Sequence, residues 1–204
     1  MNCSDWNPIP RLWDGETVIC VASGPSITDE DRETILDTRR KVIVVNRMWY
    51  SFRFADLLYA ADGRWWKSSE APQVGEFPGL RVTGSRDVAG SHRVSIRHRQ
   101  IYDDPAFISN GTNSGFQAMC LAVHLGAPRI CLVGYTMGLG QGGEIHSHED
   151  HVGLHNPGKS DFGRWLAAFA HAAPVLKAMG IQVVNCSPSA LTCFERRPLA
   201  ECIP

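Results

Sequence analysis

The chain has 204 residues, of which 44% are hydrophobic and 20% charged, and its formal net charge at pH 7 is -1. This composition is typical of a folded globular protein and excludes a disordered one. The near-zero charge gives no electrostatic reason to expect a nucleic-acid partner or an acidic membrane surface. We expect a single domain over residues 1–204, large enough for a substantial core.

The seven cysteines are scattered along the chain, and no two have Cys-x-x-Cys spacing. An odd number without a pairing pattern is typical of buried free thiols in a reducing compartment and gives little support for a thiolate zinc site. No apolar run approaches the roughly 20 residues that a membrane span needs. We therefore expect a soluble, cytoplasmic protein with no membrane contact.

Residues 1–16 are mostly polar and contain Pro8 and Pro10. They are predicted to form an N-terminal arm that lies on the surface or contacts another copy of the chain. We expect a homo-oligomer.

A short strand then runs directly into a glycine-containing turn. Residues 17–22 are apolar and of strand length, and the turn Ser23-Gly24-Pro25-Ser26 ends them. Thr28 with Asp31 three residues later is typical of a helix start. Such a turn presents backbone N–H groups where phosphates settle in open α/β folds. The alternative is an ordinary strand-to-helix turn.

The rest of the chain alternates strands with helices. The alternation predicts an α/β fold, Rossmann-like, with a mostly parallel sheet and helices on both faces. Strands are predicted over residues 41–46, 55–61, 80–83, 93–96, 129–133 and 181–185, and helices over residues 30–38, 64–68, 113–125 and 161–179.

Small polar residues follow several of these strands and open one helix. Because parallel strands end at the same edge of a sheet, we expect these residues to form a rim suited to a sugar, base or phosphate. Each residue has an ordinary alternative as a turn or helix-cap residue. The rim comprises Ser23, Gly24, Pro25, Ser26, Asn46, Asp62, Asn113, Ser114, Gly115, Tyr135, Ser187 and Ser189.

Residues 137–160 form a glycine-rich loop with four histidines: His146, His148, His151 and His155. Imidazoles bind transition metals, and one near neutral pKa can also act as a general base. A purely structural loop is the third reading. Because the loop lacks a helical frame and the H-E-x-x-H pattern, we assign no metal ligand and expect a catalytic base.

Several short motifs together resemble a known family. The segments are S-G-P-S followed by I-T-D-E, the stretch N-S-G-F-Q-A-M-C-L-A-V-H-L-G-A-P-R-I-C-L-V-G-Y, Leu154-His155-Asn156, and Ser187-Pro188-Ser189. Their order over most of the chain resembles the bacterial sialyltransferases of glycosyltransferase family 42. It is also similar to the related motility-associated factor and pterin-pyrophosphokinase-like proteins, including small phage-encoded relatives.

The resemblance implies inverting transfer of a sugar from a nucleotide donor, such as a CMP-linked sugar, to an unknown hydroxyl acceptor, without a metal or other cofactor. It implies that residues 23–26 hold the nucleotide phosphate and sugar and that Asn46 and Asp62 contact the donor. Ser114 and Gly115 would contact the nucleotide, and His155 would be the general base. The family places tyrosines after the strand that here ends at Gly134. This chain has Met137 to Gly143 there, with Tyr135 the nearest candidate.

Two other functions remain open at this point. One is a Mg²⁺-dependent diphosphate or nucleotidyl transferase that uses Asp62 and the histidine loop. The other is a non-catalytic, phage-type protein that binds a nucleotide without consuming it. Dependence on a divalent metal and consumption of the nucleotide separate the three.

Overall fold

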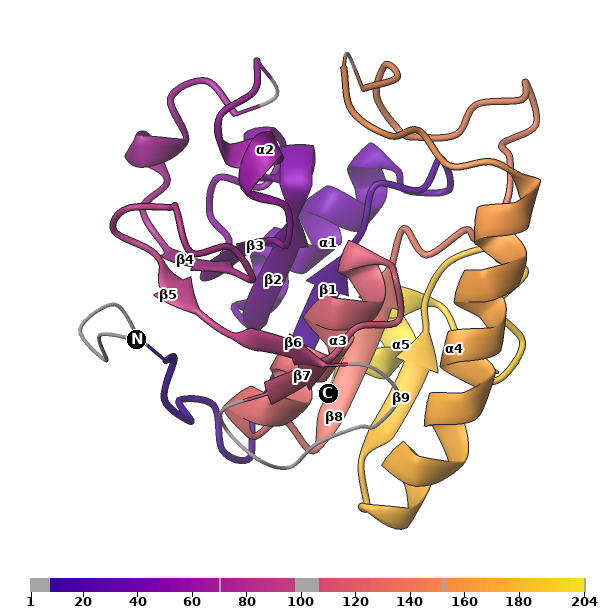
Figure 1. The fold of residues 1–204 in the computed structure, drawn as a ribbon. Coiled ribbons are helices and arrows are strands. Elements are labelled where there is room, and N and C mark those ends of the chain that lie inside the picture. The colour runs from indigo at the N-terminus through magenta and orange to yellow at the C-terminus, as the bar shows by residue number, and fades with distance from the viewer. Residues whose placement is uncertain (1–7, 70, 98–106, 152, 204) are drawn as a thin grey trace.

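The computed structural model describes residues 8–69, 71–97, 107–151 and 153–203. An eight-stranded sheet forms the centre of the molecule, in the order β10-β9-β8-β1-β2-β3-β4-β5, and every strand pairing in the described residues is parallel (Figure 1). The strands are β1 Thr17–Val21, β2 Lys41–Val45, β3 Leu57–Ala60, β4 Leu80–Thr83, β5 His92–Arg93, β8 Arg129–Val133, β9 Gln182–Asn185 and β10 Glu195–Arg196. A separate pair consists of β6 Ser95–Arg97 and β7 Phe107–Ser109.

Helices cover both faces of this sheet. One core contains residues of α3 and α4, and the opposite core contains residues of α1, α2 and α5. The predicted α/β fold, a parallel sheet between two helical layers, is therefore confirmed. The helices are α1 Asp29–Thr38, α2 Gly63–Trp66, α3 Ser114–Leu125, α4 Lys159–Ala178 and α5 Leu199–Cys202, and two 3-10 turns span η2 Asn46–Tyr50 and η3 Val74–Glu76.

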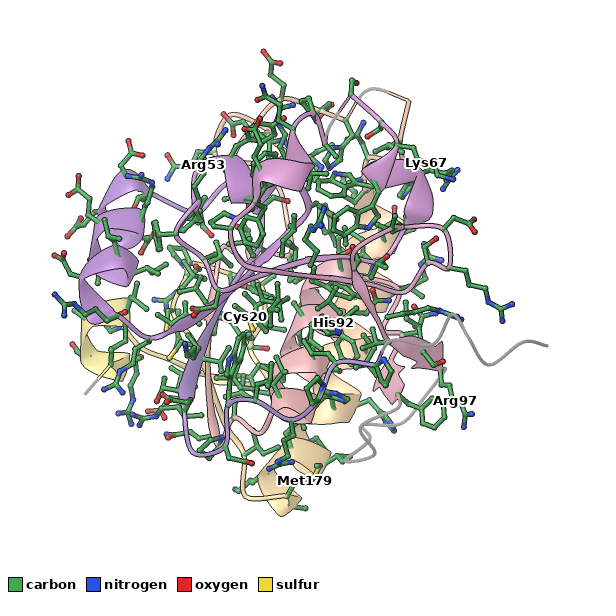
Figure 2. The ribbon with its side chains drawn as sticks, turned by 90° about the vertical axis from the view of Figure 1, so that its left-hand side faces the viewer. Cys20, Arg53, Lys67, His92, Arg97 and Met179 are labelled. Carbon is green, nitrogen blue, oxygen red and sulfur yellow. The ribbon has the colours of Figure 1, made fainter. Side chains whose placement is uncertain are left out.

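The central strands are apolar on both faces because each face is covered. In β1, Val18 and Cys20 belong to one core, whereas Ile19 and Val21 belong to the other. Successive side chains of a strand point to opposite faces, so an unbroken apolar run is what a doubly covered strand requires. Figure 2 shows Cys20 deep among the packed side chains, while Lys67 and Arg97 lie at the periphery. The six described cysteines are free, as expected.

Capping residues fix the starts of α1 and α3 within one residue of the predicted positions. The backbone N–H of Asp31 donates to Thr28 Oγ1 at 3.1 Å, and the Thr28 N–H donates to Asp31 Oδ2 at 2.9 Å. At α3, the N–H of Phe116 donates to Asn113 Oδ1 at 2.8 Å. Both arrangements satisfy N–H groups that the first helical turn leaves without an intrahelical partner.

The described part of the N-terminal arm packs into the molecule. Ile9 and Trp13 are 1% and 5% exposed, and both belong to the core on the α3 side. The Trp13 N–H donates to the carbonyl oxygen of Leu125 at 2.7 Å, and His124 Nε2 lies 2.8 Å from the Ile9 carbonyl oxygen. Residues 8–16 thus attach to the C-terminal end of α3. Residues 1–7 of the predicted arm lie outside the described residues.

The segment from 80 to 109 differs most from expectation. The predicted strand over 93–96 is divided between β5, which pairs with β4, and β6, which pairs with β7. The three residues of β7 carry too little apolar pattern to predict a strand. No helix in the described ranges is long and apolar enough to cross a membrane.

Candidate functional site

A cleft of about 200 Å³ opens at the carboxyl ends of β1, β2 and β8. The strand β1 lies between β2 and β8. The chain first adds strands on the β2 side of β1 and later adds β8 and β9 on its other side, so the strand order reverses at β1. Ligands of open α/β sheets bind in the crevice at such a point. The lining residues are Ala22, Ser23, Gly24, Val45, Asn46, Thr112, Asn113, Ser114, Gly115, Gly134, Thr136, Met137, Gly138, Ile145, His146, His151, His155, Pro157, Phe162 and Trp165.

The turns after β1 and β8 interlock at the floor of the cleft. The Gly24 N–H donates to the Gly134 carbonyl oxygen at 2.8 Å. A Cβ atom at Gly24 would overlap that oxygen and lie 2.5 Å from Thr136 Oγ1. Gly134 has φ +74°, and a Cβ atom there would overlap the carbonyl oxygen of Ala22. The glycine of the S-G-P-S turn is therefore required by the neighbouring turn, whatever ligand the cleft binds.

Asn46 follows β2 in the left-handed region, with φ 48°. Asparagine adopts this region more readily than most residues, but the conformation is still uncommon. Asn46 starts η2 and lines the cleft. Its amide is thus held at the sheet edge by the backbone, in a position to donate or accept hydrogen bonds.

The N-terminus of α3 forms the wall facing the β1 turn. Asn113, Ser114 and Gly115 line the cleft there. Tyr135 Oη donates to the Gly115 carbonyl oxygen at 2.9 Å, which fixes this helix start to the turn after β8. The positive end of the helix dipole and the N–H groups of the first turn favour an anionic ligand.

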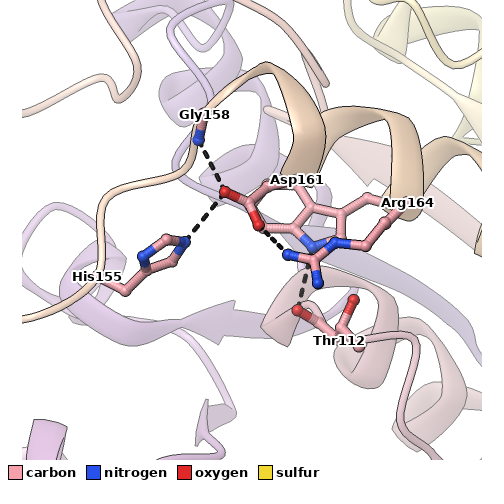
Figure 3. A network of polar contacts seen from close by, with 6 residues as sticks. Thr112, His155, Gly158, Asp161 and Arg164 are labelled. Atoms are coloured by element: carbon pink, nitrogen blue, oxygen red, sulfur yellow. Dashed lines mark hydrogen bonds and ion pairs between the residues drawn. The ribbon is translucent and has the colours of Figure 1, made fainter.

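A histidine–carboxylate pair lies at the rim where α4 begins (Figure 3). His155 Nε2 is 3.1 Å from Asp161 Oδ2, which also accepts the Gly158 N–H at 2.8 Å. Arg164 donates to the other oxygen of Asp161. Asp161 is only 6% exposed, and the Gly158 N–H, Arg164 and His155 together lower its pKa to about 2. The carboxylate is therefore charged at neutral pH, and it accepts a hydrogen bond from the Nε2–H group of His155.

The side chain of His155 is 69% exposed and lines the cleft. A neutral imidazole that donates from Nε2 carries a lone pair on Nδ1. Trp165 Nε1 donates to the Thr112 carbonyl oxygen at 3.1 Å, which ties the start of α4 to the loop before α3 (Figure 3). The arrangement can accept a proton from a hydroxyl group bound in the cleft.

The other three loop histidines form a separate cluster. The ring centroids of His146, His148 and His151 lie 4.8 to 5.1 Å apart. His146 Nδ1 is 3.2 Å from Ser23 Oγ. Burial, followed by the nearby His151 and His148, lowers the pKa of His146 to about 4. His146 is therefore neutral at pH 7 and does not repel a cation.

The structure brings together seven of the predicted site residues in this cleft. They are Ser23, Gly24, Asn46, Asn113, Ser114, Gly115 and His155. Pro25 and Ser26 line an adjoining hollow that shares Thr136 and His146 with the cleft. Thr136 Oγ1 donates to Ser26 Oγ at 2.6 Å, so the two hollows are joined by a hydrogen bond.

The other four predicted residues line neither the cleft nor the adjoining hollow. Asp62 caps α2 and forms an ion pair with Arg64 at 2.8 Å. Tyr135 is fully buried beneath the helix start, as described above. Ser187 Oγ accepts the Gly134 N–H at 2.7 Å, and Ser189 Oγ donates to the Tyr135 carbonyl oxygen. All four side chains stabilise turns or helix starts, and none of them lines the cleft.

Some residues that shape the site were not assigned to it from sequence. Asp161 is the third residue of α4 and acts as its capping carboxylate, a position that capping rules recognise. Phe162 and Trp165 add an aromatic side to the cleft. The hydrogen bond from Trp165 to Thr112 joins residues 53 positions apart, and no local pattern predicts it.

No protein-family model and no curated protein matches the chain. Two solved structures share its fold, and both are glycosyltransferases, which confirms the predicted resemblance at the level of the fold. The first is the MAf glycosyltransferase from Magnetospirillum magneticum AMB-1, with TM-score 0.64, 14% identity and 96% of this chain covered. This chain spans only 35% of that protein.

The second is the sialyltransferase CstII from Campylobacter jejuni, solved in complex with a substrate analogue, cytidine-5'-monophosphate. Its TM-score is 0.52 at 17% identity, with 90% of this chain and 85% of CstII covered. At identities this low, the structural similarity shows a shared fold alone.

Proposed function

We propose that the chain is a nucleotide-sugar-dependent glycosyltransferase. One observation carries the proposal: His155, oriented by the buried carboxylate of Asp161, lines the same cleft as the β1 turn and the N-terminus of α3. A proton acceptor therefore faces an anion-binding wall across a space of small-molecule size. That combination suits transfer of a group from a phosphate to a hydroxyl.

The donor nucleotide would bind along the sheet edge. Its phosphate would contact the Ser23 hydroxyl and the first turn of α3, where the helix dipole and backbone N–H groups favour negative charge. Asn46 would hydrogen-bond the sugar or base. Because one structural neighbour was solved with cytidine-5'-monophosphate, a cytidine nucleotide is the first donor to test.

In the proposed inverting transfer, Nδ1 of His155 takes the proton of an acceptor hydroxyl. The hydroxyl oxygen forms a bond to the anomeric carbon as the bond from that carbon to the phosphate oxygen breaks. The electron pair leaves with the phosphate, whose charge the α3 N-terminus and nearby hydroxyl groups stabilise. Asp161 stabilises the imidazolium that forms. No metal ion takes part in this step.

The Mg²⁺-dependent alternative has less support, because it relies on Asp62. That carboxylate is paired with Arg64 and lies outside the residues lining the cleft.

The test combines a binding and a turnover measurement on the full chain. CMP and UMP should raise the melting temperature, and the shift should persist in His155→Ala. Turnover of a nucleotide-sugar donor should fall about 10²- to 10⁴-fold in that variant, the usual contribution of a general base. His171→Ala, on the exposed side of α4, is the matched control and should change neither quantity.

Equal turnover by wild type and His155→Ala would contradict the assignment of the base. Nucleotide binding with no consumption of any donor would instead support a non-catalytic binding protein. Turnover only in the presence of Mg²⁺ would favour the diphosphate-transferase alternative.

A further inference from the structure

Three imidazoles of the histidine loop form a compact triangle. The rings of His146 and His148 are stacked with an interplanar angle of 10° and a centroid distance of 4.9 Å. His151 lies 4.8 and 5.1 Å from them, tilted by 59° to each. Each residue offers one ring nitrogen, and these three atoms lie within 4.8 Å of one another. Among the described residues, this is the group of side chains best arranged to hold a metal ion.

Backbone contacts hold the loop in this arrangement. The Ser147 N–H donates to the Ser23 carbonyl oxygen at 2.8 Å, which attaches the loop to the β1 turn. The His151 N–H donates to Asn156 Oδ1 at 2.8 Å, and Asn156 Nδ2 donates to the His151 carbonyl oxygen at 3.0 Å. The two ends of the segment are therefore fixed, although its described residues contain no helix or strand.

The Nδ1 atoms of His146 and His148 make the contacts that the second nitrogen of a metal-ligating histidine usually makes. His148 Nδ1 is 2.6 Å from the Glu149 carbonyl oxygen, which can only accept, so the proton lies on Nδ1 and the lone pair on Nε2. His146 Nδ1 contacts the Ser23 hydroxyl, and its Nε2 is buried and makes no hydrogen bond within the described part of the chain. A ligating histidine commonly donates its second N–H to a carbonyl or similar acceptor, which orients the ring.

We propose that His146, His148 and His151 bind a divalent transition metal ion, with Zn²⁺ as the first candidate. Imidazole nitrogen is a preferred ligand of such ions, and three protein ligands leave a fourth position of a tetrahedral site for water or a substrate. Tetrahedral Zn²⁺–nitrogen bonds of about 2.0–2.1 Å place ligand atoms roughly 3.4 Å apart, so a small inward rotation of the rings completes the site.

The ion would stiffen the wall of the cleft. His146 and His151 both line the cleft, and His146 touches the β1 turn. The ion would therefore fasten the loop to the sheet edge. His155 is not part of this site, because its Nε2 faces Asp161. The site goes beyond the proposed transfer step, which does not use the ion.

The test measures metal binding directly on the full chain after treatment with EDTA and its removal. Titration calorimetry with Zn²⁺ should give one equivalent, and Co²⁺ should produce the visible absorption of a tetrahedral nitrogen-ligated ion. His146→Ala, His148→Ala and His151→Ala should each weaken binding at least tenfold. His155→Ala, which removes the fourth histidine of the same loop, should bind like the wild type.

Circular dichroism confirms that each variant is folded, and the rise in melting temperature on adding Zn²⁺ is a second readout that only folded protein gives. The site is refuted if the wild type binds no stoichiometric Zn²⁺, or if His155→Ala loses as much affinity as the three cluster variants. The nucleotide-induced melting shift, measured with and without Zn²⁺, keeps the two proposals separate. Zn²⁺ binding without any nucleotide effect would overturn only the transferase, and the reverse result would overturn only the metal site.

Discussion

The two walls of the cleft are built in different ways. At the sheet edge, the turns after β1 and β8 are packed so closely that side chains at Gly24 and Gly134 would overlap neighbouring backbone oxygens. In the histidine loop, a Cβ atom at Gly143 or Gly153 would meet nothing within 4 Å. The fold itself therefore fixes one wall, whereas a few hydrogen bonds and a cluster of imidazoles position the other. Substitutions that add atoms to the packed turns should therefore mainly lower stability, whereas substitutions of polar side chains at the cleft and in the loop should mainly change binding or pH response.

The largest effect is expected for Gly134→Ala. The new methyl group would overlap the Ala22 carbonyl oxygen in a backbone conformation with positive φ. Overpacking costs about 1–3 kcal/mol, and a left-handed conformation costs an alanine roughly 1–2 kcal/mol more than a glycine. Urea denaturation should show a lower free energy of unfolding by about 3 kcal/mol.

Gly143→Ala is the matched control in the loop. Its φ is also positive, +90°, but there is open space around it, so only the conformational cost should appear. Equal losses of stability in the two variants would contradict the contrast between the walls.

Asp161→Asn tests the carboxylate that binds His155 at the start of α4. The folded-state pKa of Asp161, about 2, lies below the ordinary value of 3.8. Its contribution to stability is therefore present above pH 4 and is lost as the pH falls from about 4 to about 2. The melting temperature of the wild type should exceed that of the variant above pH 4, and the difference should shrink across this window. A difference independent of pH would show that the carboxylate charge is not involved.

His146→Gln examines the loop wall in metal-free protein. The pKa of His146 falls from 6.5 to about 4 on folding, so the unfolded chain binds the extra proton first as the pH is lowered. Wild-type stability should therefore decrease between pH 6.5 and 4, and the variant should lack this part of the decrease. Melting temperatures in EDTA across this range provide the measurement, and identical pH profiles would count against a buried, neutral His146.

Ser23→Ala should have the smallest effect. Loss of one hydrogen bond of ordinary strength, about 1 kcal/mol, corresponds to roughly fivefold weaker nucleotide binding. Ser187→Ala is the control at the same sheet edge: its hydroxyl accepts the Gly134 N–H, so its removal should lower stability and leave nucleotide affinity near that of the wild type. The reverse pattern would mean that Ser187 faces the ligand.

Local rules were sufficient for most of the fold. The apolar runs of β1 and β8, the capping pair Thr28–Asp31 and the Asn113 cap are all encoded within a few residues of where they act. Most of the rim residues also follow strands, as predicted, and Asn113 to Gly115 begin α3. The sequence does not show which way a turn residue points, however, and Ser187 and Ser189 point to backbone atoms of the turn after β8.

The site depends on contacts that are distant in the chain. Ser23 meets His146 across 123 positions, and Thr112 meets Trp165 across 53. The four loop histidines look equivalent in sequence, yet three face one another and the fourth faces Asp161. That division arises from the tertiary path of an irregular loop, for which periodicity and capping give no prediction.

The anchoring of Ile9 and Trp13 has a practical consequence for handling the protein. They attach at the Leu125 end of α3, whereas the cleft lies at its Ser114 end. A twelve-residue helix at 1.5 Å per residue separates these points by about 18 Å. An affinity tag or fluorescent label joined ahead of residue 8 would therefore enter the molecule away from the cleft, making that end a suitable place for surface immobilisation.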